Sequence, residues 1–284
     1  MPGVITVGLD GSGPSLVAMR WAAREAALLG AELCVCCVAA EDELGHPMLW
    51  TSPQLVRRDA TDVAREAVEK ATDDRADVRA SVTVVVGDVV RELSAAAAAS
   101  DLLVVGCRGL GAFSGLLLGS VSERLARRPP CPVVVVRGDV SAWDGPVLVG
   151  IDDAPETASA IEFAAAAADR RQVPLVALTA VPPVWSAPPA AFPLESASTG
   201  EGVMTTLREL QDDSLEPVLA RHPSVAVEHR TRFGGAARSL IEASSGSGLV
   251  VVGGGHSGLL GSVGGHVVRH AACPVAVVPA RSDG

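Results

Sequence analysis

A glycine- and serine-rich stretch between residues 106 and 122 is the part of this chain best suited to bind a charged ligand. Two residues separate Gly106 from Gly109, and nine residues separate Gly109 from Gly119, which is followed by Ser120. A helix beginning near Ser120 has amides without intrahelical partners and partial positive charge at its start. Glycine lets a phosphate approach the backbone, and hydroxyls add donors. These features of the loop and of the helix start therefore predict a polyphosphate site.

Other side chains extend this candidate site. Asp10 follows an apolar run and can accept hydrogen bonds from a base amine or a sugar hydroxyl, and Arg108 is the obvious cation of the loop. We expect Gly106 and Gly109 to take backbone conformations that other residues resist, so that the loop curls around its ligand. Each feature has a structural alternative, because Ser120 can simply cap its helix and Asp10 can be a turn residue.

The elements that position these residues occur twice along the chain. Four segments of the first half return 142 positions later, and between them the offset shifts to 147 before it returns to 142. The matches at 142 are Val7–Asp10 with Val149–Asp152, Trp21–Ala23 with Phe163–Ala165, Gly119–Val121 with Gly261–Val263, and Cys131–Val133 with Cys273–Val275. Self-similarity of this kind predicts two domains, at residues 1–140 and 145–284, joined by a linker at 138–145.

Strand and helix patterns alternate within each half. In the first half we expect strands at 4–9, 33–39, 80–86, 102–105 and 133–136, with helices at 15–29, 53–72, 89–99 and 120–128. Most of these strands are unbroken apolar runs, as in parallel sheets covered on both faces. The pattern predicts an α/β, doubly wound fold, in which ligands bind beyond the carboxyl ends of strands. Asp10, Val38 and Gly106 stand at such ends.

At these residues the sequence resembles the universal stress protein family, whose nucleotide motif is glycine, two residues, glycine, nine residues, glycine and then serine or threonine. The resemblance covers nearly the whole chain in two copies. It implies five-stranded parallel sheets of order 3-2-1-4-5 with helices on both faces. It also implies pairing through the last strand, either between the two halves or in a homodimer.

The resemblance further implies that ATP is bound, with a divalent metal such as magnesium. It places the adenine and ribose near Asp10 and Val38. It assigns the ribose and phosphates to Gly106, Arg108 and Gly109, and the phosphates to a group at the next helix start, namely Gly119, Ser120, Val121 and Ser122.

The second half departs from this pattern. Asp152, Gly253, Gly261 and Ser262 match the first-half positions, but only seven residues separate the two glycines, against twelve between Gly106 and Gly119. The loop is thus five residues shorter, with His256 in place of Gly109 and Gly264 in place of Ser122. We predict weaker binding in the second domain, or none, with an altered ligand as the alternative.

The charge and composition of the chain argue against some classes of partner. The net charge is −10 and there is no long basic run, which argues against nucleic acid. No apolar run approaches the roughly 18 residues of a membrane span, and the N-terminus lacks a signal-peptide pattern, so a cytoplasmic protein is expected. Cys34, Cys36 and Cys37 are best explained as small buried hydrophobes, and the spacing of the six cysteines does not suggest a disulfide framework. His266 and His270, four apart, lack the glutamate of a metalloprotease motif.

Three functions fit these features. The first is a nucleotide-dependent regulatory or stress-response protein without catalysis. The second is a slow ATPase or nucleotide hydrolase that relies on Arg108 and Asp10, since hydrolysis needs a positioned water and charge stabilisation. The third is an interaction scaffold whose second site is vestigial. We expect the first, with at most weak hydrolysis.

Overall fold

Strands and helices alternate throughout the part of the chain that the computed structural model describes, residues 3–40, 53–73, 77–109, 118–138, 143–152, 154, 156–181, 211–254 and 262–280. The elements of the first half are β1 (Val4–Gly8), α1 (Gly13–Leu29), β2 (Glu32–Ala40), α2 (Pro53–Thr72), β3 (Ala80–Gly87), α3 (Val89–Ala97), β4 (Leu102–Gly106), α4 (Ser120–Arg127) and β5 (Val133–Val136). The expected segments are all present, with ends that differ by no more than two residues.

The second half repeats this order. Its elements are β6 (Val147–Gly150), α5 (Thr157–Arg171), β7 (Leu175–Val181), a helix at 211–219, β8 (Val227–Phe233), α7 (Ala236–Ser244), β9 (Leu249–Gly254), α8 (Ser262–His270) and β10 (Val275–Pro279). None of the described helices is long and apolar enough to cross a membrane.

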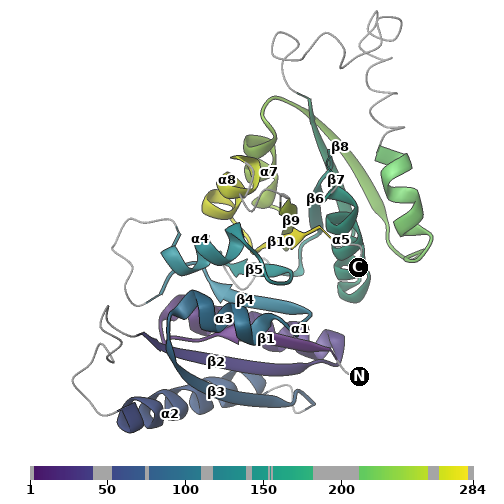
Figure 1. The fold of residues 1–284 in the computed structure, drawn as a ribbon. Helices are drawn as coiled ribbons and strands as arrows, with labels where there is room; N and C mark the ends of the chain where they lie inside the picture. Colours follow the sequence, from purple (N-terminus) through teal and green to yellow (C-terminus); the bar gives the residue numbers. More distant parts are fainter. Residues whose placement is uncertain are drawn as a thin grey trace, which may run out of the picture.

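All ten strands form one sheet in the order β3-β2-β1-β4-β5-β10-β9-β6-β7-β8. Each half therefore has the expected order 3-2-1-4-5, and within each half neighbouring strands are parallel. The halves join through β5 and β10, which pair antiparallel with Val134 opposite Ala276. Figure 1 shows these last strands at the centre of the molecule, between the two sets of helices. The expected pairing through the last strands is thus made within one chain.

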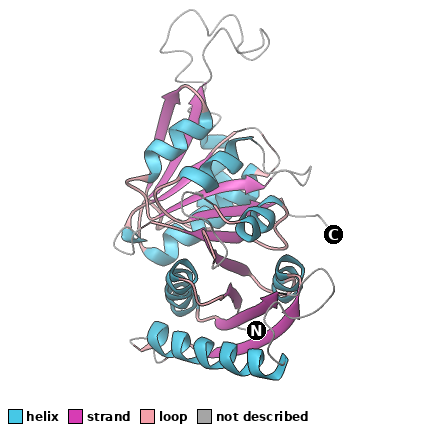
Figure 2. Ribbon diagram, turned by 90° about the vertical axis from the view of Figure 1, so that its left-hand side faces the viewer, coloured by secondary structure: helices cyan, strands magenta, loops and turns pink. Residues whose placement is uncertain are grey.

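Helices cover both faces of the sheet, as Figure 2 shows. One core layer packs α1, α2, α5 and the helix at 211–219 against one face, and the other packs α3, α4, α7 and α8 against the opposite face. Successive residues of β4 alternate between the two layers, with Val104 in the first and Val105 in the second. Both faces are buried, which explains the unbroken apolar runs.

Local signals set the ends of α1, the helix that begins at the candidate site. Ser12 is the N-cap and its hydroxyl accepts from the amide of Ser15, with Pro14 in the first turn. Gly30 ends the helix in the left-handed conformation, at φ 60°. The apolar face of the helix is buried around Trp21, which is 1% exposed. Packing of this face fixes the direction of the β1–α1 turn.

Candidate functional site

The turn after β1 holds Asp10 in one orientation. Asp10 Oδ1 accepts from the Ser12 amide at 3.0 Å, and Gly11 supplies the positive φ of 81° that the turn requires. Ser15 Oγ donates to the Ser12 carbonyl at 2.9 Å and accepts from the Asp10 amide at 3.4 Å. Asp10 therefore fills the turn role considered from the sequence, and its side chain remains exposed beyond the carboxyl end of β1.

The two ends of the glycine-rich loop are fastened to each other. The Gly119 amide donates to the Cys107 carbonyl at 2.8 Å, and Ser122 Oγ donates to the Gly106 carbonyl at 2.6 Å. The first turn of α4 is thus held against the end of β4. Residues 110–117 of the loop lie outside the described part of the chain. The backbone on either side of them meets at one place, beyond β4.

The conformational role expected of the first two motif glycines is wrong. Among the described glycines, positive φ occurs at Gly11, Gly30, Gly138 and Gly234, so neither Gly106 nor Gly109 has it. Their role is to leave space. A Cβ on Gly106 would lie 2.7 Å from the backbone of Pro14 at the start of α1, and a Cβ on Gly109 would lie 2.4 Å from Asp10 Oδ2.

Those near contacts also show that the ends of β1 and β4 adjoin. Gly109 lies directly against the Asp10 carboxylate, and Gly106 lies against the first turn of α1. Gly119 differs from both, because a Cβ there would make only ordinary contact, at 3.4 Å from the Arg108 Cα. Glycine at 119 is therefore not required by packing, and it adds no side chain at the start of α4.

The start of α4 presents donors without a protein cap. Gly119 is the N-cap and offers no side-chain hydrogen bond. The first helical amides have no acceptor within the helix. Ser120 is exposed and Val121 is half-buried, whereas Ser122 is buried and its hydroxyl serves the Gly106 carbonyl. Ser120 therefore has the more accessible hydroxyl, and the Ser122 side chain holds the loop in place.

The surrounding charges are mixed. Arg108 is exposed beside the loop, and Asp10 brings a carboxylate to the opposite side. Burial is the main cause that raises the pKa of the Cys37 thiol to about 11, and the charge of Asp10 adds to it, so Asp10 lies near the end of β2. Val38 is the next residue of that strand, paired with Val85 and half-buried. The described elements thus bring the ends of β1, β2 and β4 to one edge.

The second half rebuilds only part of this arrangement. Asp152 Oδ1 accepts from the Ala154 amide at 3.2 Å and from the Thr157 hydroxyl, which repeats the turn around Asp10. A Cβ on Gly253 would lie 2.9 Å from the Cβ of Glu156, which is 8% exposed and stands where the first half has Pro14. This end of the second domain therefore carries an additional buried acidic side chain.

Several second-half residues of the candidate site lie outside the described residues. Gly261 and His256 are among these, as is the side chain of Ser262, although the backbone of Ser262 begins α8. Gly264 is described and buried within α8.

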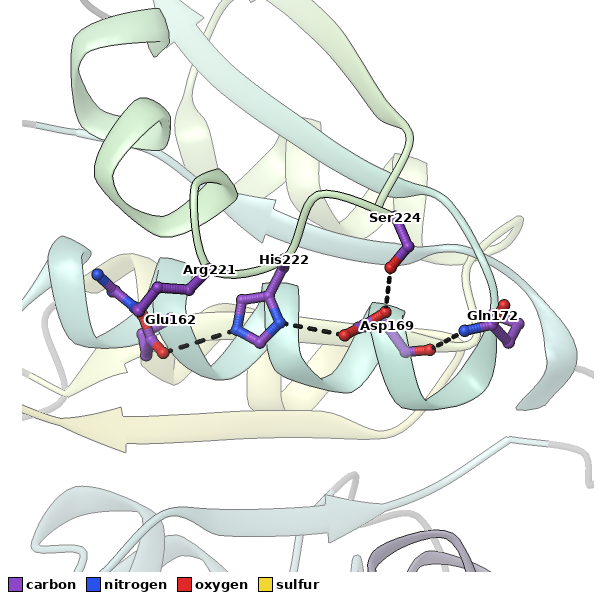
Figure 3. A network of polar contacts seen from close by, with 6 residues as sticks. All are labelled: Glu162, Asp169, Gln172, Arg221, His222 and Ser224. Atoms are coloured by element: carbon purple, nitrogen blue, oxygen red, sulfur yellow. Dashed lines mark hydrogen bonds and ion pairs between the residues drawn. The ribbon is translucent and has the colours of Figure 1, made fainter.

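A separate polar cluster joins α5 to the segment before β8, and the sequence analysis missed it (Figure 3). His222 Nδ1 lies 3.2 Å from Asp169 Oδ2, and His222 Nε2 lies 3.7 Å from Glu162 Oε1. Ser224 donates to Asp169, and Arg221 pairs with Glu162. Because the serine hydroxyl bonds the aspartate and not the imidazole, the cluster lacks the nucleophile–base contact of a hydrolase.

This cluster extends along α5, away from the second-domain turn around Asp152 and Thr157. Glu162 stands five residues and Asp169 twelve residues after Thr157, or about 8 and 18 Å at 1.5 Å of rise per residue. A surface hollow of about 340 Å³ also lies elsewhere, on the helix at 211–219, where Asp212 and Glu216 are among its lining residues. Carboxylates there suit a polyphosphate poorly.

The described histidines, carboxylates and cysteines bear on whether the chain holds a metal site or a disulfide. These contain no group of three or more His, Cys, Asp and Glu residues able to hold a metal ion. His266 and His270 stack with ring centroids 6.1 Å apart on α8. All six cysteines are free thiols. Cys36 and Cys37 face opposite core layers, which confirms these two as small core residues, whereas Cys34 is only half-buried.

Known proteins show the same two-part organisation. The model of the universal stress protein family matches residues 1–137 and again residues 145–279. A universal stress protein of Mycolicibacterium smegmatis is 37% identical over 294 residues, covering 98% of this chain and 97% of that protein. One from Mycobacterium tuberculosis is 35% identical over 295 residues, covering 96% and 95%.

A solved structure shares the fold across the full length. A universal stress protein from Archaeoglobus fulgidus superposes with a TM-score of 0.71 at 19% identity, covering 99% of this chain and 100% of that one.

Proposed function

Because the chain belongs to the universal stress protein family, with two tandem family domains, we propose that it is a cytoplasmic regulatory protein that binds an adenine nucleotide, ATP foremost, in its first domain. The supporting observation is the convergence of the β4 end and the α4 start. Two hydrogen bonds, from Gly119 to Cys107 and from Ser122 to Gly106, hold the first turn of α4 at the edge where Asp10 also lies.

Each part of this edge suits one part of a nucleotide. The amides of Ser120 and Val121 meet phosphate oxygens at the positive end of α4, and the Ser120 hydroxyl adds a donor. Arg108 supplies the cation that balances phosphate charge. Asp10, with one oxygen fixed by the Ser12 amide, presents its carboxylate for base or sugar donors. A divalent ion would be held largely by the phosphates themselves, as magnesium commonly is.

The proposal places the principal site in the first domain. In the second domain Glu156 adds a buried acidic side chain beside Gly253, and the connecting loop is five residues shorter. Negative charge beside the end of β9, the strand that leads into this loop, opposes a polyphosphate. The second domain then contributes by contacting the first rather than by holding a nucleotide of its own.

The identity of the ligand is tested by mass spectrometry of whatever the purified chain releases on denaturation, together with titrations of ATP, ADP, AMP and cyclic AMP. We expect an adenine nucleotide and tightest binding for ATP. A chain that releases no nucleotide and binds none of the four at millimolar concentration contradicts the proposal.

A turnover assay separates binding from catalysis. We expect stoichiometric binding with turnover too slow to be functional, because Asp10 is held by the β1–α1 turn and Glu123 is neutralised by two arginines, which leaves neither carboxylate set up as a base. Multiple turnovers that disappear in both Arg108→Ala and Asp10→Ala would instead establish a nucleotide hydrolase.

A further inference from the structure

One carboxylate in the first turn of α4 is shared between the two domains. Glu123 Oε1 accepts from Arg127 Nη2 at 3.1 Å, one turn along the same helix. The same oxygen accepts from Nη2 of Arg269, which is on α8 of the second domain. The side chains of Glu123 and Arg269 are 30% and 37% exposed, so the pair is partly shielded from water.

The position of Glu123 relates this contact to the candidate phosphate site. Helical side chains tilt toward the helix N-terminus, so Glu123 shares a face with Gly119 and Ser120, four and three residues earlier. A carboxylate on this face stabilises the empty helix start, and it repels a polyphosphate bound there. The two arginines that neutralise Glu123 therefore bear directly on ligand affinity.

A second contact ties the site to the same turn of α8. Arg137, directly after β5, donates from Nη1 to the carbonyl of Val268 at 2.8 Å. Burial lowers the pKa of Arg137 most, and the charge of Arg108 lowers it further, so the two guanidinium groups are close. The Cys107 amide donates to the Val136 carbonyl at 3.0 Å, just before Arg137. The β4 end of the loop thus lies beside the end of β5, from which Arg137 reaches the last turn of α8.

The internal repeat shows that the shared carboxylate belongs to one site only. At the offset of 142, Arg127 corresponds to Arg269, but Glu123 corresponds to Gly265. The second domain consequently has no carboxylate at this position for Arg127 to neutralise across the interface. An arginine of the second domain thus pairs with a carboxylate of the first, but the equivalent pair between Arg127 and the second domain does not exist.

Resting on the proposed function, we propose that Arg269 of the second domain is an electrostatic component of the first-domain nucleotide site. It neutralises Glu123 when polyphosphate binds, and it transmits occupancy of that site to α8. The effect depends on ligand charge, so it is large for ATP and small for AMP. The second domain thereby acts as a sensor of the nucleotide in the first.

The test compares Arg269→Gln and Glu123→Gln by calorimetric titration with ATP and AMP. Arg269→Gln should weaken ATP binding about three- to tenfold, the range for one partly screened charge, and should change AMP binding less. Glu123→Gln should leave ATP binding equal or tighter. Arg238→Gln, which breaks the exposed Arg238–Glu242 pair on α7 at 2.7 Å, is the matched control and should bind as wild type does.

Hydrogen exchange of the segment 262–270 provides a second readout. ATP should slow exchange there in the wild-type chain, and this protection should be smaller in Arg269→Gln at saturating ATP. Equal ATP affinity in Arg269→Gln and wild type overturns the inference while leaving the proposed function intact. An equal loss of ATP affinity in Glu123→Gln and Arg269→Gln also overturns the inference, since it indicates that the ion pair only supports the fold. A wild-type chain that binds no nucleotide overturns the proposed function itself.

Discussion

At the scale of single residues, the motif glycines have different physical roles. Gly106 leaves room for the backbone of Pro14, Gly109 leaves room for the Asp10 carboxylate, and Gly119 keeps a helix start uncovered. The spacing of these glycines could be predicted as a ligand motif from the sequence. Their separate roles could not, because close approach to α1 depends on tertiary packing that no local pattern specifies.

Substitution by alanine should separate these roles. Gly106→Ala forces a Cβ to within 2.7 Å of the Pro14 backbone and should destabilise the chain by about 1–3 kcal/mol, as overpacking does. Gly119→Ala makes only ordinary contacts and should cost less than about 1 kcal/mol. Urea unfolding of both variants measures the difference. Equal destabilisation would show that Gly119 is also a packing residue.

Cysteine reactivity tests the burial of the thiols. Burial raises the pKa to about 12 for Cys36 and Cys273 and to about 11 for Cys37 and Cys131. Since the thiolate is the nucleophile, these four should resist iodoacetamide at pH 8 in the folded chain. The partly exposed Cys34 and Cys107 should react first, and all six should react in denaturant. Peptide mass spectrometry checks the order, and early labelling of Cys36 would contradict the described core.

At the scale of elements, the apolar runs predict the strands well, and the polar contacts between elements are what the sequence conceals. In the first half, Ala64 and Cys37 lie in the core layer that includes α2, and Val82 packs against that layer. The corresponding second-half residues are Gln211, Thr179 and His229. Gln211 donates to Thr179 at 2.6 Å and lies 3.1 Å from His229, although it is only 1% exposed. Polar residues that satisfy one another in this way give no apolar periodicity.

The cluster around His222 should make stability depend on acid. The hydrogen bond from Arg221 is the main cause that lowers the Glu162 pKa, and the one from Ser224 is the main cause for Asp169. A carboxyl group whose pKa is lower in the folded chain than in the unfolded chain stabilises the fold. The stabilisation is complete above the ordinary pKa, which is 4.5 for Glu162 and 3.8 for Asp169, and it is lost as the pH falls through the pKa of the folded state. Urea midpoints between pH 6 and about 3 measure the loss.

Glu162→Gln is the variant that isolates this contribution. It should be less stable than wild type at pH 6 and should show a shallower decline toward acid. A decline as steep as that of wild type would assign the acid sensitivity to other carboxyls.

At the scale of the whole molecule, the two halves form one sheet because β5 and β10 pair with each other. The resemblance to the family implied pairing through the last strands, but it left open whether the partner was the other half or another chain. An apolar last strand can pair equally well within one chain or between two chains, so the sequence pattern alone could not distinguish these two arrangements. The contacts of α1 with α5 across the junction were also unpredictable, since they join residues about 146 positions apart.

The ion pair at that junction should be important for stability. Arg171 donates twice to Glu25 Oε1, at 2.6 and 3.0 Å, with side chains 2% and 4% exposed, and its guanidinium lies over the Trp21 ring. Arg171→Met leaves the Glu25 charge buried without its partner and should cost about 3–5 kcal/mol.

Two further variants separate charge from contact area. The double variant Glu25→Gln, Arg171→Met should recover part of the loss, because the stranded charge is removed. Arg24→Met, which breaks the exposed pair with Asp144 at the same junction, should cost less than about 1 kcal/mol. Thermal unfolding compares the three, and a loss for Arg24→Met equal to that for Arg171→Met would contradict the assigned role of burial.

The number of nucleotides bound per chain tests the central claim most directly. A calorimetric titration of the wild-type chain with ATP should saturate at one nucleotide per chain. In Gly119→Val the added side chain covers the α4 amides while the fold is retained, so the same titration should show no binding at this site. Full stoichiometric binding by a folded Gly119→Val variant would contradict the account, because the nucleotide would then be held elsewhere than at the junction of β4 and α4.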